Sequence, residues 1–289
     1  MKHLYSILAV LLCITACQAQ DKEIKTFSIL GDSYSTFDGH IPEGNACWYF
    51  STPQGENDVT CVEQTWWHQF AKDSGLELIL NESYSGSTIC NSGYDGADYS
   101  DRAFTTRMFK VAEGKPDLII VFGGTNDSWA NSPIGELQFD RWSSEDMYSC
   151  LPSCCFMLNY LTTAAPDSEI VFLINSELKY EITAGIAEAC DHYGVHWLLL
   201  KDIEKKWGHP SIKGMAQINE QLKAFLAERV CEELRGGTGA CAHIRFHGGI
   251  VVGCKECHDQ QYTDNTQRTG HSYRIDQPAA AQTGNLNCA

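Results

Sequence analysis

Short apolar runs alternate with longer amphipathic segments along most of this chain. Five runs have the aliphatic and aromatic content of strands buried on both faces of a parallel sheet. These runs are residues 27–30, 76–80, 118–122, 170–174 and 197–200. Helical periodicity occurs over residues 63–73, 144–164, 180–193 and 211–234. The alternation predicts an α/β fold, a three-layer α/β/α sandwich with a mainly parallel five-stranded sheet.

The start of the chain differs from this central part. A short positively charged segment and an apolar run end at Ala16, which is typical of a secretory signal. Residues 14–17 resemble a bacterial lipobox, in which Cys17 becomes the lipidated first residue; ordinary signal cleavage nearby is the alternative. We predict a signal peptide of lipoprotein type over residues 1–16 and a tether over residues 17–25, with the protein exported to the bacterial cell envelope and anchored there by lipid.

The end of the chain changes composition at about residue 236, and Leu286 is the only Leu in the last 54 residues. Such a segment buries little core, so we predict one folded domain over residues 26–235 and a disordered or disulfide-linked tail over residues 236–289. A reading-frame error would also explain the change. The run from Cys254 to His258 matches the C-x-x-C-H pattern of haem attachment. A metal site is a further alternative, drawn from Cys241, His243, His247, Cys254, Cys257 and His258.

Charge and cysteine content narrow the class of protein. A formal net charge of −16 opposes binding to phosphate backbones, so we expect no nucleic-acid partner. No later stretch approaches the roughly 20 apolar residues of a membrane span, so we expect membrane contact through the lipid anchor only. The chain has 14 cysteines, and export would permit a disulfide between Cys47 and Cys61 or Cys90. On helices, Cys154 and Cys190 fit buried free thiols.

Candidate chemistry follows the predicted strands, because ligands of open parallel sheets bind beyond the carboxyl ends of the strands. Ser33 comes two residues after the first strand, Gly86 follows the second and Asn126 follows the third. His209 precedes the last helix. Acyl transfer needs a nucleophile, donors for the developing oxyanion and a base, and these residues supply all three in order. Taken alone, Gly31-Asp32-Ser33 also fits a turn with a capping Ser.

These blocks resemble those of the SGNH (GDSL-like) hydrolases, which contribute a Ser, a Gly, an Asn and a His in this chain order. The matched residues are Ser33, Gly86, Asn126 and His209, and the resemblance covers roughly residues 26–234. It implies a flavodoxin-like fold and an oxyanion hole formed by the Ser33 N–H, the Gly86 N–H and the Asn126 side chain. It further implies Ser33 as nucleophile and His209 as base, with no metal or organic cofactor.

One position departs from the family pattern. An Asp usually stands three residues before the His and orients it, and here that residue is Lys206. A Lys cannot accept the imidazole hydrogen bond. Asp202 or Glu204 could reach His209 instead, a backbone carbonyl could suffice as in dyad members of the family, or activity could be weak.

Other polar and aromatic residues near these blocks have simpler interpretations. Asp32 and Asp127 fit roles in holding loops through backbone hydrogen bonds. The aromatic residues of 48–50, with Tyr84 and Trp129, could stack on a sugar ring. Trp66 and Trp67 lie in a helical pattern and fit packing in the core.

We therefore expect a carboxylic ester hydrolase acting on a small-molecule or carbohydrate ester and removing short acyl groups, acetyl among them. One alternative is a catalytically weak surface glycan-binding module on the same fold, for which Lys206 is the support. Another is a lysophospholipase or thioesterase, which would need a long apolar acyl groove; no contiguous apolar loop predicts one.

Overall fold

The computed structural model describes residues 23–53, 55–236 and 245–246, which belong to two units. The smaller unit includes β1 (Glu23–Ile24), paired in parallel with β9 (Arg245–Phe246), and the end of helix α7. The larger unit, residues 25–223, contains the central sheet. The predicted signal peptide, Cys17 and the Cys and His residues of the tail lie outside the described residues.

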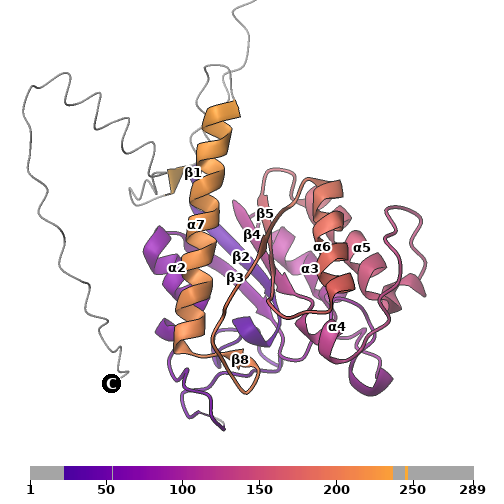
Figure 1. The fold of residues 1–289 in the computed structure, drawn as a ribbon, viewed down its shortest axis with the longest axis horizontal. Helices are drawn as coiled ribbons and strands as arrows, with labels where there is room; N and C mark the ends of the chain where they lie inside the picture. Colours follow the sequence, from indigo (N-terminus) through magenta and orange to yellow (C-terminus); the bar gives the residue numbers. More distant parts are fainter. Residues whose placement is uncertain (1–22, 54, 237–244, 247–289) are drawn as a thin grey trace, which may run out of the picture. The chain divides into compact units, whose positions relative to one another are not determined.

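The central sheet has five strands in the order β3-β2-β4-β5-β6, and every neighbouring pair is parallel (Figure 1). This confirms the predicted three-layer architecture. Each strand coincides with one of the five apolar runs. The strands are β2 (Thr26–Gly31), β3 (Glu77–Ser83), β4 (Leu118–Gly123), β5 (Glu169–Ile174) and β6 (His196–Leu199).

The predicted helices are present, with shifted starts in three cases. They are α2 (Trp66–Ser74), α5 (Cys150–Ala164), α6 (Tyr180–Tyr193) and α7 (Ile212–Gly236). Two helices were not predicted, α3 (Phe104–Glu113) and the five-residue α4 (Thr125–Trp129). Residues 146–148 form a 3₁₀ turn before α5, so the predicted helix over 144–164 begins too early.

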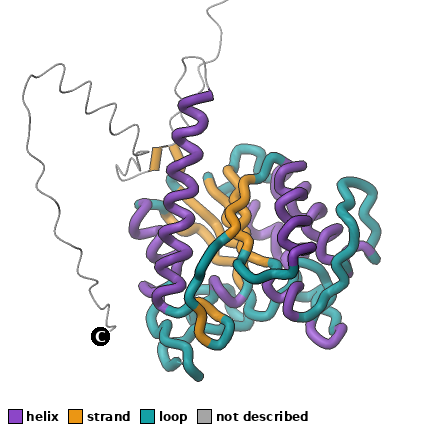
Figure 2. The backbone as a smooth tube through the Cα atoms, viewed as in Figure 1, coloured by secondary structure: helices purple, strands orange, loops and turns teal. Residues whose placement is uncertain are grey.

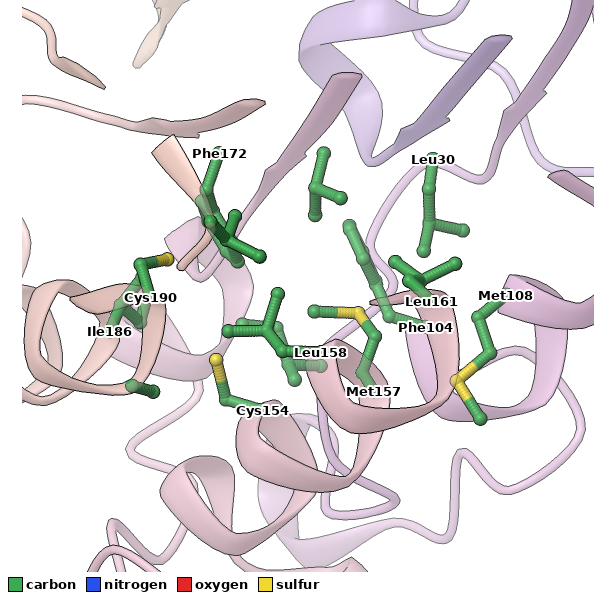
Figure 3. Packing of buried hydrophobic residues seen from close by; sticks show 14 of the residues in the cluster. Leu30, Phe104, Met108, Cys154, Met157, Leu158, Leu161, Phe172, Ile186 and Cys190 are labelled. Carbon is green, nitrogen blue, oxygen red and sulfur yellow. The ribbon is translucent and has the colours of Figure 1, made fainter. Parts of the chain in front are cut away.

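One face of the sheet packs against α3, α5 and α6 (Figure 1). Because side chains alternate along a strand, Leu30, Val121 and Phe172 point to this face. They meet apolar residues of the three helices in one cluster (Figure 3). Cys154 and Cys190 are buried thiols of the same cluster, as predicted.

The opposite face packs against α2, to which the first half of α7 is joined by the Asn219 amide, a donor to Asp73 at 2.9 Å. Phe27 contacts Phe70 edge-on, with ring centroids 5.4 Å apart, and Trp66 contacts Phe122 at 5.9 Å. Trp66 and Trp67 are therefore core residues, as expected. The hairpin of β7 (Lys205–Lys206) and β8 (His209–Pro210) lies with several loops at one end of the sheet (Figure 2).

The predicted disulfide involving Cys47 or Cys90 is wrong, because both are free thiols. Cys61 is disulfide-bonded, but to neither of them. In the part of the chain that the structure describes, no helix combines the length and apolar character that crossing a membrane requires.

Candidate active site

The candidate nucleophile lies at the carboxyl end of β2. Gly31 ends the strand where a Cβ would lie 2.5 Å from Ser83 Oγ, so a larger residue would displace the chain. Asp32 caps the following 3₁₀ turn by accepting the Tyr34 N–H at 3.0 Å, the loop-holding role expected of it. The turn places Ser33 in a buried position, 2% exposed.

Ser33 and His209 are brought together across 176 residues of sequence, with Ser33 Oγ 2.9 Å from His209 Nε2. His209 Nδ1 lies 3.0 Å from the backbone carbonyl oxygen of Trp207. A carbonyl oxygen only accepts hydrogen bonds, so Nδ1 carries the proton. Nε2 of the neutral ring is then the acceptor and receives the Ser33 hydroxyl proton, the arrangement that a general base requires.

A two-residue hairpin presents His209. Strand β7 (Lys205–Lys206) pairs antiparallel with β8 (His209–Pro210), which leaves Trp207 and Gly208 as the loop. Both loop residues have positive φ, 53° and 73° respectively, as a type I′ hairpin turn requires. This turn places the Trp207 carbonyl oxygen within hydrogen-bonding distance of His209 Nδ1.

Two tyrosines hold the backbone on either side of His209. The hydroxyl of Tyr34 donates to the Gly208 carbonyl, and the hydroxyl of Tyr49 donates to the Pro210 carbonyl at 2.9 Å. Both tyrosines are fully buried. They connect the loops after β2 to the hairpin and fix its position, although neither was singled out for this role in the sequence.

Lys206 turns away from the imidazole. It lies opposite His209 in the hairpin, and its Nζ forms an ion pair with Asp58 at 2.7 Å. Of the two carboxylates that could have reached His209, Glu204 accepts the Ser211 hydroxyl at 2.7 Å and Asp202 is exposed. Neither is the partner of Nδ1.

Burial sets the protonation state of His209, the candidate base. His209 is 5% exposed, and burial lowers its pKa to about 4, helped by Lys205 and opposed by the hydrogen bond to Trp207. His209 is therefore neutral at pH 7. Burial also raises the pKa of Asp32 to about 7. Within the described residues, no group of three or more His, Cys, Asp or Glu side chains is arranged to hold a metal ion.

Two of the predicted oxyanion donors are backbone N–H groups. Gly86 has φ of 84° and would meet nothing within 4 Å if it carried a Cβ, so its backbone faces open space. Neither the Gly86 N–H nor the Ser33 N–H has an acceptor among the described residues. The strands that precede Gly86 and Ser33 are neighbours, so both groups lie at the same edge of the sheet.

The third predicted donor is the Asn126 side chain in α4, which is 2% exposed. Its Nδ2 donates to the Ser87 carbonyl at 2.9 Å, and its Oδ1 accepts from the Tyr94 hydroxyl at 2.8 Å. The amide is thus oriented from both ends, and one Nδ2 hydrogen stays available. Asp127 holds the adjacent loop by accepting the Ile89 N–H at 2.8 Å, as expected of it.

A buried guanidinium supports this edge of the sheet. Arg107 of α3 donates to the Glu82 carbonyl, to the Gly31 carbonyl at 3.1 Å and to the Ser87 hydroxyl at 2.8 Å. It joins the ends of β2 and β3 to the loop that follows Gly86. Its role could have been suspected from the sequence, because Arg107 is a charged residue three positions after Phe104 on an otherwise apolar helix face.

The aromatic residues expected to bind a sugar divide into two groups. Trp129 is 41% exposed beside His209, with ring centroids 5.8 Å apart. Trp48 stacks on the imidazole itself, Tyr49 is buried, and Tyr84 lies under Arg102. Trp207, which was not predicted for this role, is 60% exposed on the hairpin.

Comparison with known proteins agrees with this geometry. The profile of the family described as GDSL-like Lipase/Acylhydrolase matches residues 25–226. The crystal structure of a Bacteroides ovatus protein described as a GDSL-like lipase superposes on this chain with a TM-score of 0.69. The two sequences are 49% identical, and the alignment covers 72% of this chain and 100% of the Bacteroides ovatus chain. A second protein described in the same way, from Bacteroides uniformis, is 50% identical in sequence, with a TM-score of 0.69. The alignment covers 71% of this chain and 96% of the Bacteroides uniformis chain.

A more distant carbohydrate esterase structure shares the fold, at 14% identity and a TM-score of 0.50, covering 77% of this chain and 72% of its own. Among curated protein sequences, none matches this chain significantly. The family profile spans the sheet and all four sequence blocks, and two solved structures are about half identical over that region. The chain therefore belongs to the GDSL-like lipase/acylhydrolase family.

Proposed function

We propose that this protein is a serine ester hydrolase that works through a Ser33–His209 dyad and removes short acyl groups from carbohydrate or other small esters. The observation that carries the proposal is the 2.9 Å contact between Ser33 Oγ and an unprotonated His209 Nε2. The Ser33 and Gly86 N–H groups follow the neighbouring strands β2 and β3 and have no acceptor among the described residues.

In the proposed reaction, Ser33 Oγ attacks the ester carbonyl carbon while His209 Nε2 takes the hydroxyl proton. The Ser33 and Gly86 N–H groups and Asn126 Nδ2 donate to the oxyanion that forms. The imidazolium then returns its proton to the departing alcohol, which leaves an acyl-serine. His209 then takes a proton from a water molecule, whose oxygen attacks the acyl carbon; the imidazolium returns this proton to Ser33 Oγ as the acyl–Oγ bond breaks and the carboxylic acid leaves.

Trp129 and Trp207 support a carbohydrate as the alcohol portion. Both indoles are exposed: Trp129 has its ring centroid 5.8 Å from that of His209, and Trp207 lies in the hairpin that carries His209. Exposed aromatic faces stack on the apolar faces of sugar rings. We expect Trp129→Ala to weaken kcat/KM for an acetylated sugar while leaving p-nitrophenyl acetate hydrolysis nearly unchanged. Equal loss on both substrates would remove the carbohydrate part of the proposal.

The direct test measures hydrolysis of p-nitrophenyl acetate, butyrate and decanoate by the full chain and by Ser33→Ala. We expect turnover to be highest on the short acyl groups and to be abolished in the variant. Full activity in Ser33→Ala would refute the nucleophile assignment, and absence of activity in both proteins would favour a glycan-binding module. A preference for decanoate would favour a lysophospholipase or thioesterase.

We also propose that the protein is exported and anchored by a lipid on Cys17. This proposal rests only on the resemblance of residues 14–17 to a lipobox. Membrane fractionation of cells producing the wild type and Cys17→Ser tests this. We expect the protein in the membrane fraction only when Cys17 is present; equal distribution of the two would exclude the anchor.

A further inference from the structure

The imidazole of His209 is surrounded by aromatic rings, one of which lies flat against it. The Trp48 and His209 ring centroids are 3.6 Å apart and the ring planes differ by 10°. Tyr34 is tilted at 5.2 Å, whereas Trp129 and Tyr49 approach edge-on at 5.8 Å and 6.4 Å. Trp48 therefore covers one face of the base.

The backbone of Trp48 is fixed to the turn that carries the nucleophile. Its N–H donates to Thr36 Oγ1 at 2.9 Å, and the same Thr36 hydroxyl donates to the Ser33 carbonyl at 3.0 Å. The stacked ring is thus placed by the same short segment that places Ser33. A shift of this loop would move the nucleophile and the ring over its base together.

The reaction requires His209 to become a cation in a place that opposes positive charge. The ring is buried, and the charged side chain whose field acts on it is the Lys205 ammonium. The other titratable groups around the ring, Tyr34 and Tyr49, are neutral phenols at pH 7. The partner of Nδ1 is the uncharged Trp207 carbonyl. The stabilisation that a carboxylate supplies in a triad must come from elsewhere.

We propose, resting on the proposed esterase function, that Trp48 is a positioning residue whose indole face stabilises the imidazolium form of His209. A cation over the face of Trp is attracted by the ring quadrupole, more strongly when the pair is shielded from water. The stack also holds the imidazole plane in line with Ser33 Oγ and the Trp207 carbonyl. Trp48 thereby supplies the charge stabilisation that a carboxylate would give, whereas the Trp207 carbonyl orients the ring.

The test compares Trp48→Leu, which keeps an apolar cover over the ring but removes the π face, with the conservative Trp48→Phe. We expect kcat of Trp48→Leu to fall about 2- to 30-fold, with KM for p-nitrophenyl acetate nearly unchanged. The acid limb of its kcat/KM profile should move to lower pH. Trp48→Phe should lie between Trp48→Leu and the wild type. The matched control is Trp197→Leu at the start of β6, outside the site, which should keep wild-type kinetics.

NMR titration of the His209 imidazole in the wild type and Trp48→Leu gives a readout that does not need activity. We expect a lower imidazole pKa in the variant, by about 0.3 to 1.5 units, at an unchanged fold by circular dichroism. An equal or higher pKa in Trp48→Leu would overturn the inference, even if the enzyme is active. If the wild type hydrolyses no ester, the proposed function fails, whereas the titration still decides the role of Trp48. If Trp48→Leu does not fold, the titration of Trp48→Phe decides by the same criterion.

Discussion

The His209 imidazole takes its orientation from Trp207, whose backbone carbonyl oxygen lies 3.0 Å from Nδ1 within the same six-residue hairpin, residues 205–210. A backbone carbonyl fixes the tautomer as a carboxylate does, because both only accept hydrogen bonds. It brings no negative charge into the buried site. The family's usual Asp position can therefore be occupied by Lys206, which faces Asp58.

We expect Lys206→Ala to keep kcat/KM for p-nitrophenyl acetate within about threefold of the wild type, because exposed ion pairs contribute little. The Lys206 side chain is 43% exposed and its partner Asp58 is 31% exposed. Steady-state kinetics of the two proteins measures this. A loss of a hundredfold or more would mean that Lys206 takes part in the reaction.

The hairpin turn makes a second prediction possible. Gly208 has φ of 73°, and a Cβ there would lie 3.0 Å from Trp129 Cη2. Gly208→Ala should lower stability by about 1–2 kcal/mol through backbone strain and should reduce kcat at least tenfold by displacing the Trp207 carbonyl. Thermal unfolding and kinetics measure the two effects.

The matched control for this variant is Gly194→Ala at the end of α6. Gly194 has φ of 65° and nothing within 4 Å of a Cβ, so it carries the same strain without a clash. We expect a similar loss of stability with unchanged kcat. If both variants lose the same activity, the loss in Gly208→Ala comes from lower stability. The prediction that the turn positions the Trp207 carbonyl for catalysis would then be wrong.

The Asn126 amide should be the donor most easily removed by substitution. Asn126→Ala is expected to reduce kcat by about 10²–10³, the usual effect of deleting one oxyanion donor. Tyr94→Phe removes only the hydrogen bond to Asn126 Oδ1, so its loss should be below tenfold. Turnover of p-nitrophenyl acetate under saturating conditions tests both. Unchanged kcat in Asn126→Ala would exclude the amide from the oxyanion hole.

The pH dependence should reflect the buried base. With its pKa lowered to about 4 by burial, His209 stays neutral as pH falls past 6.5, its ordinary value. Activity is then lost only near pH 4, where Nε2 takes up a proton and can no longer accept one from Ser33. A kcat/KM profile between pH 3.5 and 8 tests this. An acid limb near 6.5 would show a base more exposed to water than the structure has it.

The lowered pKa of His209 also makes the stability of the folded protein depend on pH. Between pH 6.5 and about 4 the unfolded chain protonates His209 while the folded chain does not, so acidification favours unfolding over this range. His209→Gln removes the titrating group, so the slope of unfolding free energy against pH should be smaller in that variant. Denaturant unfolding at pH 6.5 and 4.5 measures the difference. Identical slopes would mean that the folded-state pKa is unshifted.

Much of the fold and the four blocks of the site followed from the sequence. Buried strands leave continuous apolar runs, and the residues directly after parallel strands must meet at one edge. Ser33, Gly86 and Asn126 were found by this rule together with the resemblance of their chain order to that of the SGNH (GDSL-like) hydrolases. The helix α3 was missed, although Arg107 on its apolar face supports the ends of β2 and β3. The disulfide expectation failed because sequence does not encode connectivity.

The sequence by itself determined the sheet, the family and the chain order of the candidate site residues, since these depend on local patterns of residue types. Only the tertiary structure decided what orients His209. Its Nδ1 partner is a backbone carbonyl, which every residue has, so no residue type marks it. Trp48 stacks on the ring from 161 positions away, and Tyr34 and Tyr49 hold the hairpin across similar distances. Such contacts arise when distant segments pack together, and one sequence carries no periodic signal of them.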